Sequence, residues 1–470
     1  MNAVSELKRQ RGQGSAVSPV VRELLARDSK ALSAALAAVG NHEPAVRQVP
    51  FSRYLDPAVV ELERERIWKR MWQFACREED IPAVGDRWTY DVGPLSYVIV
   101  RSAPDEIRAF PNACLHRGNR LAFGQGSGEH LRCAFHGWTW ALDGQLKELP
   151  SRWDFPQVDS DAYRLPEIKV GRWGGYVFIN PDPDCAPLES ALGVLPAHFS
   201  SWTADDRFTY VHVRKLIRAN WKVTMEAFLE AYHVIETHSD SLIFTGDAST
   251  QYDIWDDGHS HISRLITPLA VPSPHLGDDA SVQVALDAVM QVFAMGMGEA
   301  TPHFDAEKGS GRADVAEWRR QTMGAAFGRD FSALCDAELV DTIQYFMFPN
   351  FCPWYGEGLP LSYQFLPYGD DPDASVMSIR LLLPVPGGGA PRPPAAPVIE
   401  LGFDDDFSRT PELGLIAHIF QQDMSNVPNV QRGMKAAASG FRTATLGHYQ
   451  ESRISHFHAT LERYLGLQDA

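Results

Sequence analysis

The 470-residue sequence predicts an α+β protein in which a small all-β domain precedes a larger domain of helices and strands. From about residue 88 to residue 180, short runs of β-branched and aromatic residues alternate with Gly, Pro and Asp, which is typical of strands. After residue 186, strand-like runs are mixed with helical patterns. We therefore expect an N-terminal arm and helix in residues 1–69, the β domain in 70–185 and the larger domain in 186–470.

Local sequence patterns predict the elements near the N-terminus and in the β domain. A helix is expected near Ser29–Val39, and a second helical run opens at Asp56-Pro57, because Pro fits the first turn and apolar residues follow at helical spacing. In the β domain, Asp143-Gly144 predicts a two-residue hairpin turn, and Gly174–Asn180 predicts a buried strand.

The same patterns predict the elements of the larger domain. Residues with high β-propensity predict strands at Phe208–Leu216, His261–Leu269, Leu361–Leu366 and Ser375–Val385. Helical spacing predicts helices at Asn220–Asp240, Ser281–Met297 and Ala313–Ala326, a fourth from about Pro411 and a last one from Glu451. Pro384–Pro397 is too rich in Pro and Gly for regular structure and is expected to be a surface loop.

Composition and charge limit the possible functions. Hydrophobic residues make up 44% and charged residues 22% of the chain, as in ordinary globular proteins. The net charge of −17 argues against nucleic-acid binding, because phosphate would be repelled. No apolar run approaches the roughly 20 residues that span a bilayer, and the polar N-terminus does not resemble a signal peptide. Only two of the six cysteines belong to the motif described below, and the others show no obvious pairing, so we expect a cytoplasmic protein without a membrane partner.

Two ligand pairs lie inside the predicted β domain: Cys114-x-His116 and Cys133-x-x-His136. Two thiolates and two imidazoles in two short loops are what a Rieske [2Fe–2S] cluster requires, with the cysteines on one iron and the histidines on the other. Gly118 and Gly137 follow the pairs closely, where the backbone must bend around sulfur and offer N–H groups to it.

This motif has two other interpretations. A Cys₂His₂ zinc site uses the same ligand types, but its histidines are usually spaced H-x₃₋₅-H, whereas here each loop supplies one Cys and one His. Buried cysteines and histidines without a ligand role are the second interpretation, and the ordered spacing argues against it.

A second candidate metal site lies in the predicted helix Asn220–Asp240. Glu230 and His233 are three residues apart and would share a helix face. His233 and His238 are five apart, about 140° around an ideal helix, so a helix end or a π-bulge is needed to bring them together. Two histidines and a distant carboxylate would form the facial triad of a non-haem Fe(II) oxygenase, although the H-x₄-H spacing alone is a weak signal.

Both segments resemble known motifs. The first resembles the Rieske signature C-x-H-x₁₅₋₁₇-C-x₂-H. The second resembles the mononuclear-iron motif N-W-K…E-N-x-x-[DE]-x-Y-H-x₄-H, with a departure at Ala227, where family members often carry Asn. From about residue 50 the chain is thus similar to the large catalytic alpha subunit of the Rieske non-haem iron (aromatic ring-hydroxylating) oxygenases. The residues that match the second motif are Asn220, Trp221, Lys222, Glu230, Tyr232, His233 and His238.

The resemblance implies a fold and a third iron ligand. It implies an all-β Rieske domain inserted in a helix-grip catalytic domain with an antiparallel sheet, residues 1–69 packing with the catalytic part. Asp423, eight residues before Gln431-Arg432-Gly433, is the expected carboxylate ligand. Asp404–Asp406 is a rival run of acids, but such a run in a loop is more often solvated. His456 and His458 are interpreted as structural.

The resemblance also implies a function. The chain would be the terminal oxygenase component of a homotrimer, with a small beta subunit as an option. It would use O₂ and NAD(P)H-derived electrons that arrive through a reductase, with or without a ferredoxin. Glu230 would link a cluster histidine of one subunit to His233 of the next. Basic residues near the cluster motif (Arg117, Arg120, Arg132 and Lys147) would steer an acidic donor.

The sequence is compatible with several substrate classes. The expected substrate is an aromatic or other hydrophobic ring that is hydroxylated or cis-dihydroxylated. The alternatives are oxidative N- or O-demethylation, oxygenation of a quaternary ammonium compound, and a pure electron carrier, which would need only the β domain. The expected pocket residues are Phe228, Leu229, Phe346–Phe348, Phe365 and the helices of residues 281–326.

Overall fold

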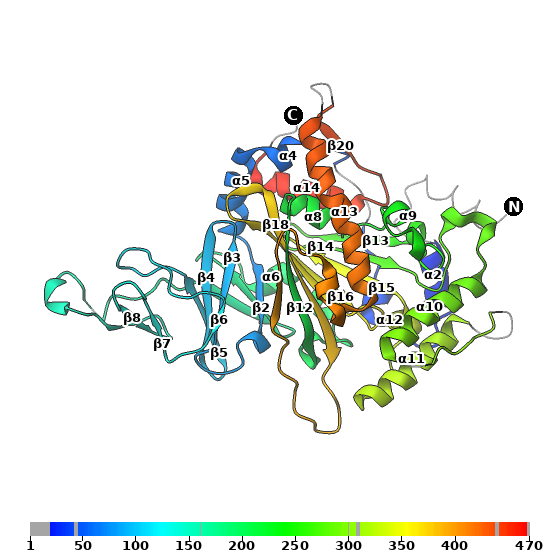
Figure 1. Ribbon diagram of the computed structural model, residues 1–470, viewed down its shortest axis with the longest axis horizontal. Coiled ribbons are helices and arrows are strands. Elements are labelled where there is room, and N and C mark those ends of the chain that lie inside the picture. The colour runs from blue at the N-terminus through cyan, green and yellow to red at the C-terminus, as the bar shows by residue number, and fades with distance from the viewer. Residues whose placement is uncertain are drawn as a thin grey trace. The chain divides into compact units, whose positions relative to one another are not determined.

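The computed structural model describes residues 19–41, 46–159, 161–298, 300–306, 311–437 and 441–467. The chain forms two compact units. The small unit comprises Val60–Ala191 and Pro367–Asp371, and the large unit comprises the chain through Val59, Leu192–Leu366 and the chain from Pro372 onwards (Figure 1). The chain thus leaves the large unit, forms the small one and returns. Much of the expected N-terminal arm lies outside the described residues.

Three antiparallel sheets form the small unit, in the orders β10-β11-β2, β5-β4-β3-β6 and β7-β8-β9. The predicted hairpin at Asp143-Gly144 is present, but Ala141 N donates to Gln145 O, so Leu142 joins the turn and the two-residue prediction is wrong. Gly144 takes a φ of 88°, which explains the glycine. The strands are β2 (Gln73–Arg77), β3 (Arg87–Val92), β4 (Leu95–Ala103), β5 (Glu106–Pro111), β6 (Gln125–Gly126), β7 (His130–Arg132), β8 (Thr139–Ala141), β9 (Leu146–Glu148), β10 (Lys169–Trp173) and β11 (Tyr176–Asn180).

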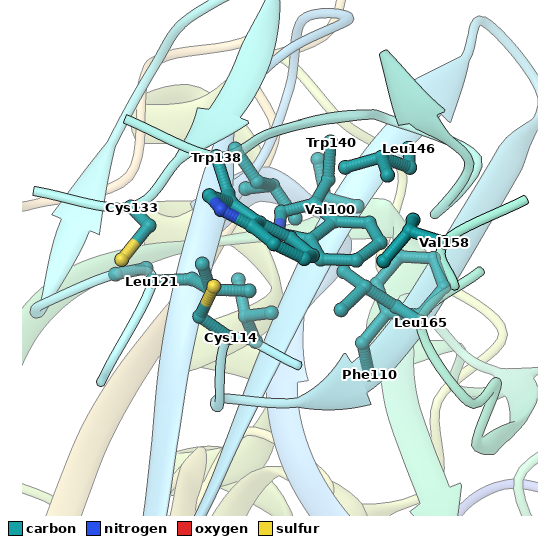
Figure 2. Packing of buried hydrophobic residues seen from close by; sticks show 13 residues of the cluster. Val100, Phe110, Cys114, Leu121, Cys133, Trp138, Trp140, Leu146, Val158 and Leu165 are labelled. Carbon is teal, nitrogen blue, oxygen red and sulfur yellow. The ribbon is translucent and has the colours of Figure 1, made fainter. Parts of the chain in front are cut away.

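One apolar cluster in the small unit supports both ligand loops. Trp140 and Phe110 are fully buried in it, and Cys114 and Cys133 belong to it. Figure 2 shows the two cysteines on the side of this cluster away from Val158 and Leu165. The loops are therefore anchored on a packed core, while their tips are left free for a ligand.

An eight-stranded sheet organises the large unit, in the order β13-β14-β15-β16-β17-β18-β12-β19 (Figure 1). Strands β13 to β17 pair antiparallel, as do β12 and β18, whereas β12 and β19 are parallel. The four predicted strands are confirmed; β13, β15, β16 and β19 were not predicted. The strands are β12 (Arg207–Ile217), β13 (Gln251–Asp256), β14 (His261–Thr267), β15 (Thr342–Met347), β16 (Phe351–Tyr355), β17 (Leu361–Tyr368), β18 (Asp371–Pro384) and β19 (Val398–Leu401).

Long helices pack with this sheet. The predicted helices in the regions of α10, α11, α13 and α14 are confirmed, and α14 contacts β13 and β14. The helix predicted at Ser29–Val39 is mostly wrong, because only the short α3 forms there. The helices are α2 (Pro19–Ala26), α3 (Ala34–Ala37), α4 (Ser52–Leu55), α5 (Pro57–Glu63), α6 (Leu188–Leu192), α7 (Leu195–His198), α8 (Trp221–Glu226), α9 (Val234–Thr237), α10 (Val282–Met297), α11 (Arg312–Phe327), α12 (Asp336–Val340), α13 (Leu415–Ala436) and α14 (Ser452–Leu465), with a π-helix at Arg64–Trp68.

The segment 220–240 is not the single helix that the sequence predicts. Helix α8 begins after Asn220, whose side chain accepts from Lys222 N, and it ends at Glu226. A non-helical stretch follows, and then the four-residue helix α9, with His233 and His238 as the residues that flank it. This break, rather than a π-bulge, changes the direction of the two imidazoles.

An early and a late segment of the chain pair in the large unit. Strand β1 (Gln48–Pro50) pairs antiparallel with β20 (Thr443–Thr445). Among the described residues, no helix is both long and apolar enough to cross a membrane.

Candidate functional site

The two ligand loops of the small unit share one hydrogen-bond pattern. Cys114 N donates to Asn119 O and Cys133 N to Trp138 O, at 2.9 and 2.8 Å. Each loop then closes on itself, because the N–H of the glycine four residues after each cysteine donates to that cysteine's carbonyl, at 2.9 and 3.0 Å. These glycines take φ values of +77° and +73°, a left-handed conformation that most side chains resist.

Backbone N–H groups surround the two thiols. Burial raises the pKa of the Cys114 thiol, while the His116 N–H opposes this effect. For Cys133 burial also acts to raise the pKa, but the N–H groups of Phe135 and His136, with Cys114 and Asn119, outweigh it and lower the pKa. Asn119 Nδ2 lies 3.7 Å from Cys133 Sγ. The loops thus supply donors to sulfur, as an iron–sulfur site needs.

The two imidazoles of these loops lie together. The ring centroids of His116 and His136 are 4.6 Å apart, and the His116 ring stacks on Trp138 at 5.1 Å. The Nδ1 atom of His116 is buried without a hydrogen-bond partner, which leaves a nitrogen for a metal. Burial and the charges of His136 and Arg117 lower the pKa of His116, which favours the neutral ring that coordinates iron. The four side chains fit a Rieske [2Fe–2S] cluster.

The second predicted site is assembled in the large unit. Helix α13 contacts α9, which places Asp423 beside the two histidines. Asp423 Oδ1 lies 3.0 Å from His238 Nε2 and 3.7 Å from His233 Nε2, and one potential ligand atom from each of the three residues falls within 4.8 Å of the others. The side chains of Asp423 and His238 are 3% and 6% exposed. Two imidazoles and one carboxylate match the facial triad of non-haem Fe(II).

Each histidine of this site has an outer partner. Nδ1 of His233 donates to Glu230 Oε1 at 2.7 Å, and Nδ1 of His238 donates to Gln422 Oε1 at 2.9 Å. These bonds hold a proton on each Nδ1, so that Nε2, the ring atom facing Asp423, is the atom available to bind a metal. Burial acts to lower the pKa of His233, but Glu230 and Asp423 raise it to about 9. The carboxylates of Glu230 and Asp423 therefore favour a positive charge at this site, which a bound Fe(II) would supply.

Glu230 lies in the non-helical stretch rather than on a helix face. Its Oε2 atom accepts the backbone N–H groups of Tyr232 and His233, while Oε1 accepts from the imidazole of His233. One carboxylate thus fixes both the backbone and the ring of a candidate ligand. Gln422 was not predicted from the sequence; its position directly before Asp423 on a helix was the available signal.

The rival acids are placed elsewhere. Asp404 pairs with Arg218 at 2.8 Å and its side chain is 86% exposed. Asp405 accepts from Gly402 N, and Asp406 accepts from Ser408 N. The run is therefore solvated and used in local turns.

The histidines near the C-terminus belong to other clusters. His458 bonds to Tyr54 and Glu226 at 3.0 and 2.7 Å. Among the described residues, Asp256, His261 and His456 form one further set of donors within metal-ligand distance. Arg463 already contacts both oxygens of Asp256, so this set is a partly exposed ion-pair cluster.

A cavity of about 260 Å³ adjoins the iron site. Predicted residues that line it are Phe228 and, from α10, Val292 and Phe293. Leu229, Phe346–Phe348 and Phe365 are buried in the core and are not among the lining residues, so that part of the prediction is wrong. Unpredicted walls come from β14 to β17 and from α13, and include Leu265, Gln344, Trp354, Tyr363, Leu415, Ile416, Ile419 and Phe420.

Two family models match the chain. Residues 71–159 match the Rieske [2Fe-2S] domain, and residues 198–467 match the ring hydroxylating alpha subunit (catalytic domain).

Curated relatives have different substrates in their names. The carnitine monooxygenase oxygenase subunit of Escherichia coli K12 is 30% identical over 193 residues, which are 40% of this chain and 52% of that protein. The 2-aminobenzenesulfonate 2,3-dioxygenase subunit alpha of Alcaligenes sp. is 26% identical over 221 residues, or 45% of this chain and 56% of that one. The chain therefore spans about half the length of these curated relatives.

Solved structures resemble most of the chain. The quaternary ammonium Rieske monooxygenase CntA with an inhibitor gives a TM-score of 0.61 at 18% identity, and covers 90% of this chain and 96% of that one. Naphthalene 1,2-dioxygenase with indole gives 0.58 at 18% identity, with 90% and 95% covered. At these identities the likeness establishes the fold.

Proposed function

The chain belongs to the family of ring hydroxylating alpha subunits, and from this premise we propose that it is the terminal oxygenase of a multicomponent Rieske oxygenase. The observation that carries the proposal is the convergence of His233, His238 and Asp423 at the end of an apolar cavity, in a chain that also has the four ligands of a Rieske cluster. An electron carrier would need neither the triad nor the cavity.

The residues of the small unit would bind the iron–sulfur cluster that stores electrons. Cys114 and Cys133 would bind one iron of the cluster, and His116 and His136 the other. His136 is exposed, and the exposed ring of Phe135 lies 3.8 Å from it between centroids. This open edge suits a protein partner such as a reductase or a ferredoxin, which would deliver NAD(P)H-derived electrons.

The residues of the large unit hold the mononuclear iron. His233, His238 and Asp423 would bind it on one face, with Glu230 and Gln422 keeping the rings in the correct tautomer. The bound Fe(II) supplies the chemistry that combines O₂ with a substrate held in the cavity. The apolar walls exclude water, so that reducing equivalents are not lost to side reactions.

We also propose a homotrimer in which Glu230 links two sites. The hydrogen bond from His233 supports the half of this link that lies within one chain. The other half would be a cluster histidine of the neighbouring copy. All six cysteines are free, which supports a cytoplasmic location.

The proposed reaction is hydroxylation or cis-dihydroxylation of an aromatic or other hydrophobic ring. An apolar cavity of roughly 150 Å³ holds benzene, so about 260 Å³ accommodates a substituted ring. The second candidate is a quaternary ammonium compound or an N- or O-methyl substrate, because Phe228, Trp354 and Tyr363 could surround a methylated cation.

Iron content and oxygen use test the proposal. The purified, reconstituted protein should contain about three irons per chain, two in the cluster and one mononuclear. With a surrogate reductase and NADH, oxygen uptake should depend on an added ring compound. Two irons per chain, or uptake that no substrate stimulates, would contradict an oxygenase.

A further inference from the structure

One wall of the cavity carries a polar side chain whose direction is fixed from behind. Gln344 lies on β15 and is 2% exposed. Its neighbours across the sheet are Leu265 on β14 and Trp354 on β16, and all three line the cavity. A buried amide between two apolar neighbours is costly unless its groups are bonded.

Arg453 of α14 determines which end of this amide faces the cavity. Its guanidinium is fully buried and donates from Nη1 to Gln344 Oε1 at 2.9 Å. Further bonds to Ser263 Oγ and Leu229 O, at 3.1 and 3.2 Å, hold it in place. Because arginine can only donate, the amide oxygen must point to it, and the amide NH₂ is left on the other side. Among the described residues, nothing accepts a hydrogen bond from Gln344 Nε2.

Two threonine hydroxyl groups on the same wall already form hydrogen bonds within the protein. Thr267 Oγ1 bonds to Thr250 Oγ1 at 2.9 Å, and Thr342 Oγ1 donates to Thr267 O at 3.4 Å. The wall thus leaves the amide NH₂ of Gln344 and the indole N–H of Trp354, which is buried without a hydrogen-bond partner, as donors for a ligand. Of these, the Gln344 amide is the donor whose direction is fixed by a charged side chain behind it.

The charged groups around the cavity also limit which ligands it can hold. Its described lining contains no Lys or Arg. The ionisable groups that could carry charge there are the candidate iron ligands with their partner Glu230. A carboxylate or sulfonate in the cavity would be desolvated, and no Lys or Arg of the described lining could pair with it. The charge of a bound iron would already be offset by the carboxylates of Asp423 and Glu230.

We infer that the cavity takes an uncharged ring compound with a hydrogen-bond acceptor, such as a ketone, that receives the N–H of Gln344, and that it rejects anionic ring compounds. This inference rests on the proposed oxygenase function and narrows its substrate class. Gln344 acts as a specificity residue, and Arg453 as the residue that positions it. Carnitine and 2-aminobenzenesulfonate, named for two relatives, both carry acidic groups that this wall does not suit.

Three ligands of nearly equal shape test the inference: acetophenone, ethylbenzene and benzoate. Binding to the oxidised holoenzyme is followed under argon by calorimetry, so that turnover plays no part. We expect acetophenone to bind about 3–10-fold more tightly than ethylbenzene, the range that one neutral hydrogen bond gives, and benzoate to bind at least about 10-fold more weakly than acetophenone.

Two variants separate the amide from general effects on the wall. Gln344→Leu should bind acetophenone and ethylbenzene with equal affinity, and its melting temperature and cluster spectrum show that it is folded. Thr342→Val, on the same strand and face, should keep the preference for acetophenone. If Gln344→Leu does not fold, Gln344→Met serves the same comparison.

The outcomes distinguish this inference from the oxygenase proposal. Equal affinities in the wild type, an unchanged preference in the Gln344 variant, tighter binding of benzoate or no binding of either neutral ligand would overturn the inference. The oxygenase proposal would still stand on three irons per chain and substrate-dependent oxygen uptake.

Discussion

The two candidate metal sites of this protein are built in opposite ways. The four cluster ligands come from two loops close together in the sequence, and each loop makes the same backbone hydrogen bonds. The three iron ligands come from the two flanks of α9 and from α13, which follows much later in the chain. His136 is exposed, whereas His238 and Asp423 are buried.

The difference follows from the different functional requirements of the two sites. A site that receives electrons from another protein needs an edge near the surface. A site that oxidises a bound substrate needs a closed apolar space, since water competes for reactive groups. Local loops suit the first requirement, and tertiary packing around a cavity suits the second.

Removing the buried carboxylate should have the largest effect. Asp423→Ala is expected to lower turnover by at least about 10³-fold, because two imidazoles alone do not retain Fe(II). Iron analysis should fall from about three to two per chain while the cluster spectrum is unchanged. Asp404→Ala, a change to an exposed acid, is the control and should keep both values. Full iron content in Asp423→Ala would exclude Asp423 as a ligand.

Mutation of a histidine at the exposed site should remove the cluster and leave the mononuclear iron in place. His116→Ala or His136→Ala is expected to remove the visible and EPR signature of the Rieske cluster, because imidazole ligands give that cluster its high potential. Mononuclear iron should remain. A variant that keeps the reduced Rieske signal would show that the mutated histidine is not a ligand.

Glu230→Gln tests the residue proposed to connect the two sites. The amide keeps the size but loses the charge that holds the His233 ring, so turnover should fall by about 10–100-fold while both metal sites stay filled. Single-turnover oxidation of the pre-reduced cluster measures the step directly. A wild-type rate would show that Glu230 is a bystander, and loss of iron would make it a ligand.

Gln422→Leu should weaken only the binding of the mononuclear iron. Without its acceptor, His238 loses the bond that fixes its tautomer, and iron affinity should fall by about 10-fold. Competition with a chelator measures this affinity. Gln421→Leu, which alters the neighbouring amide that accepts from Phe407 N, is the control. Equal affinity in both variants would contradict an ordering role for Gln422.

The smallest expected effect concerns electron entry. Arg120 pairs with Asp91 at 2.7 Å and Arg132 with Glu148 at 3.5 Å, so Arg117 and Lys147 are the better sites to test for steering. Reversing these two charges should slow reduction by an acidic ferredoxin several-fold at low salt and weaken its salt dependence. Stopped-flow absorbance of the cluster gives the rate. Unchanged kinetics at low salt would place the docking surface elsewhere.

The same contrast explains what could be predicted from sequence. The cluster ligands are local, so their spacing alone suggested the site. His233 and His238 were found by their motif, but their convergence depends on a break after Glu226 that helical periodicity does not show. Asp423 was found through resemblance only. Gln344 and Arg453 meet because β15 and α14 pack together, and nothing in the sequence near either residue indicates the contact.

The four-residue helix α9 has a consequence for how iron enters and leaves. It has no buried residue, although the two flanking histidines are candidate ligands. One turn of helix without a fully buried side chain opens at low free-energy cost compared with the strands of the sheet. We therefore expect local opening of α9 to set the rate of metal exchange. Backbone amides of Val234–Thr237 should then exchange hydrogen much faster than those of β14 and β15, and iron loading should slow that exchange.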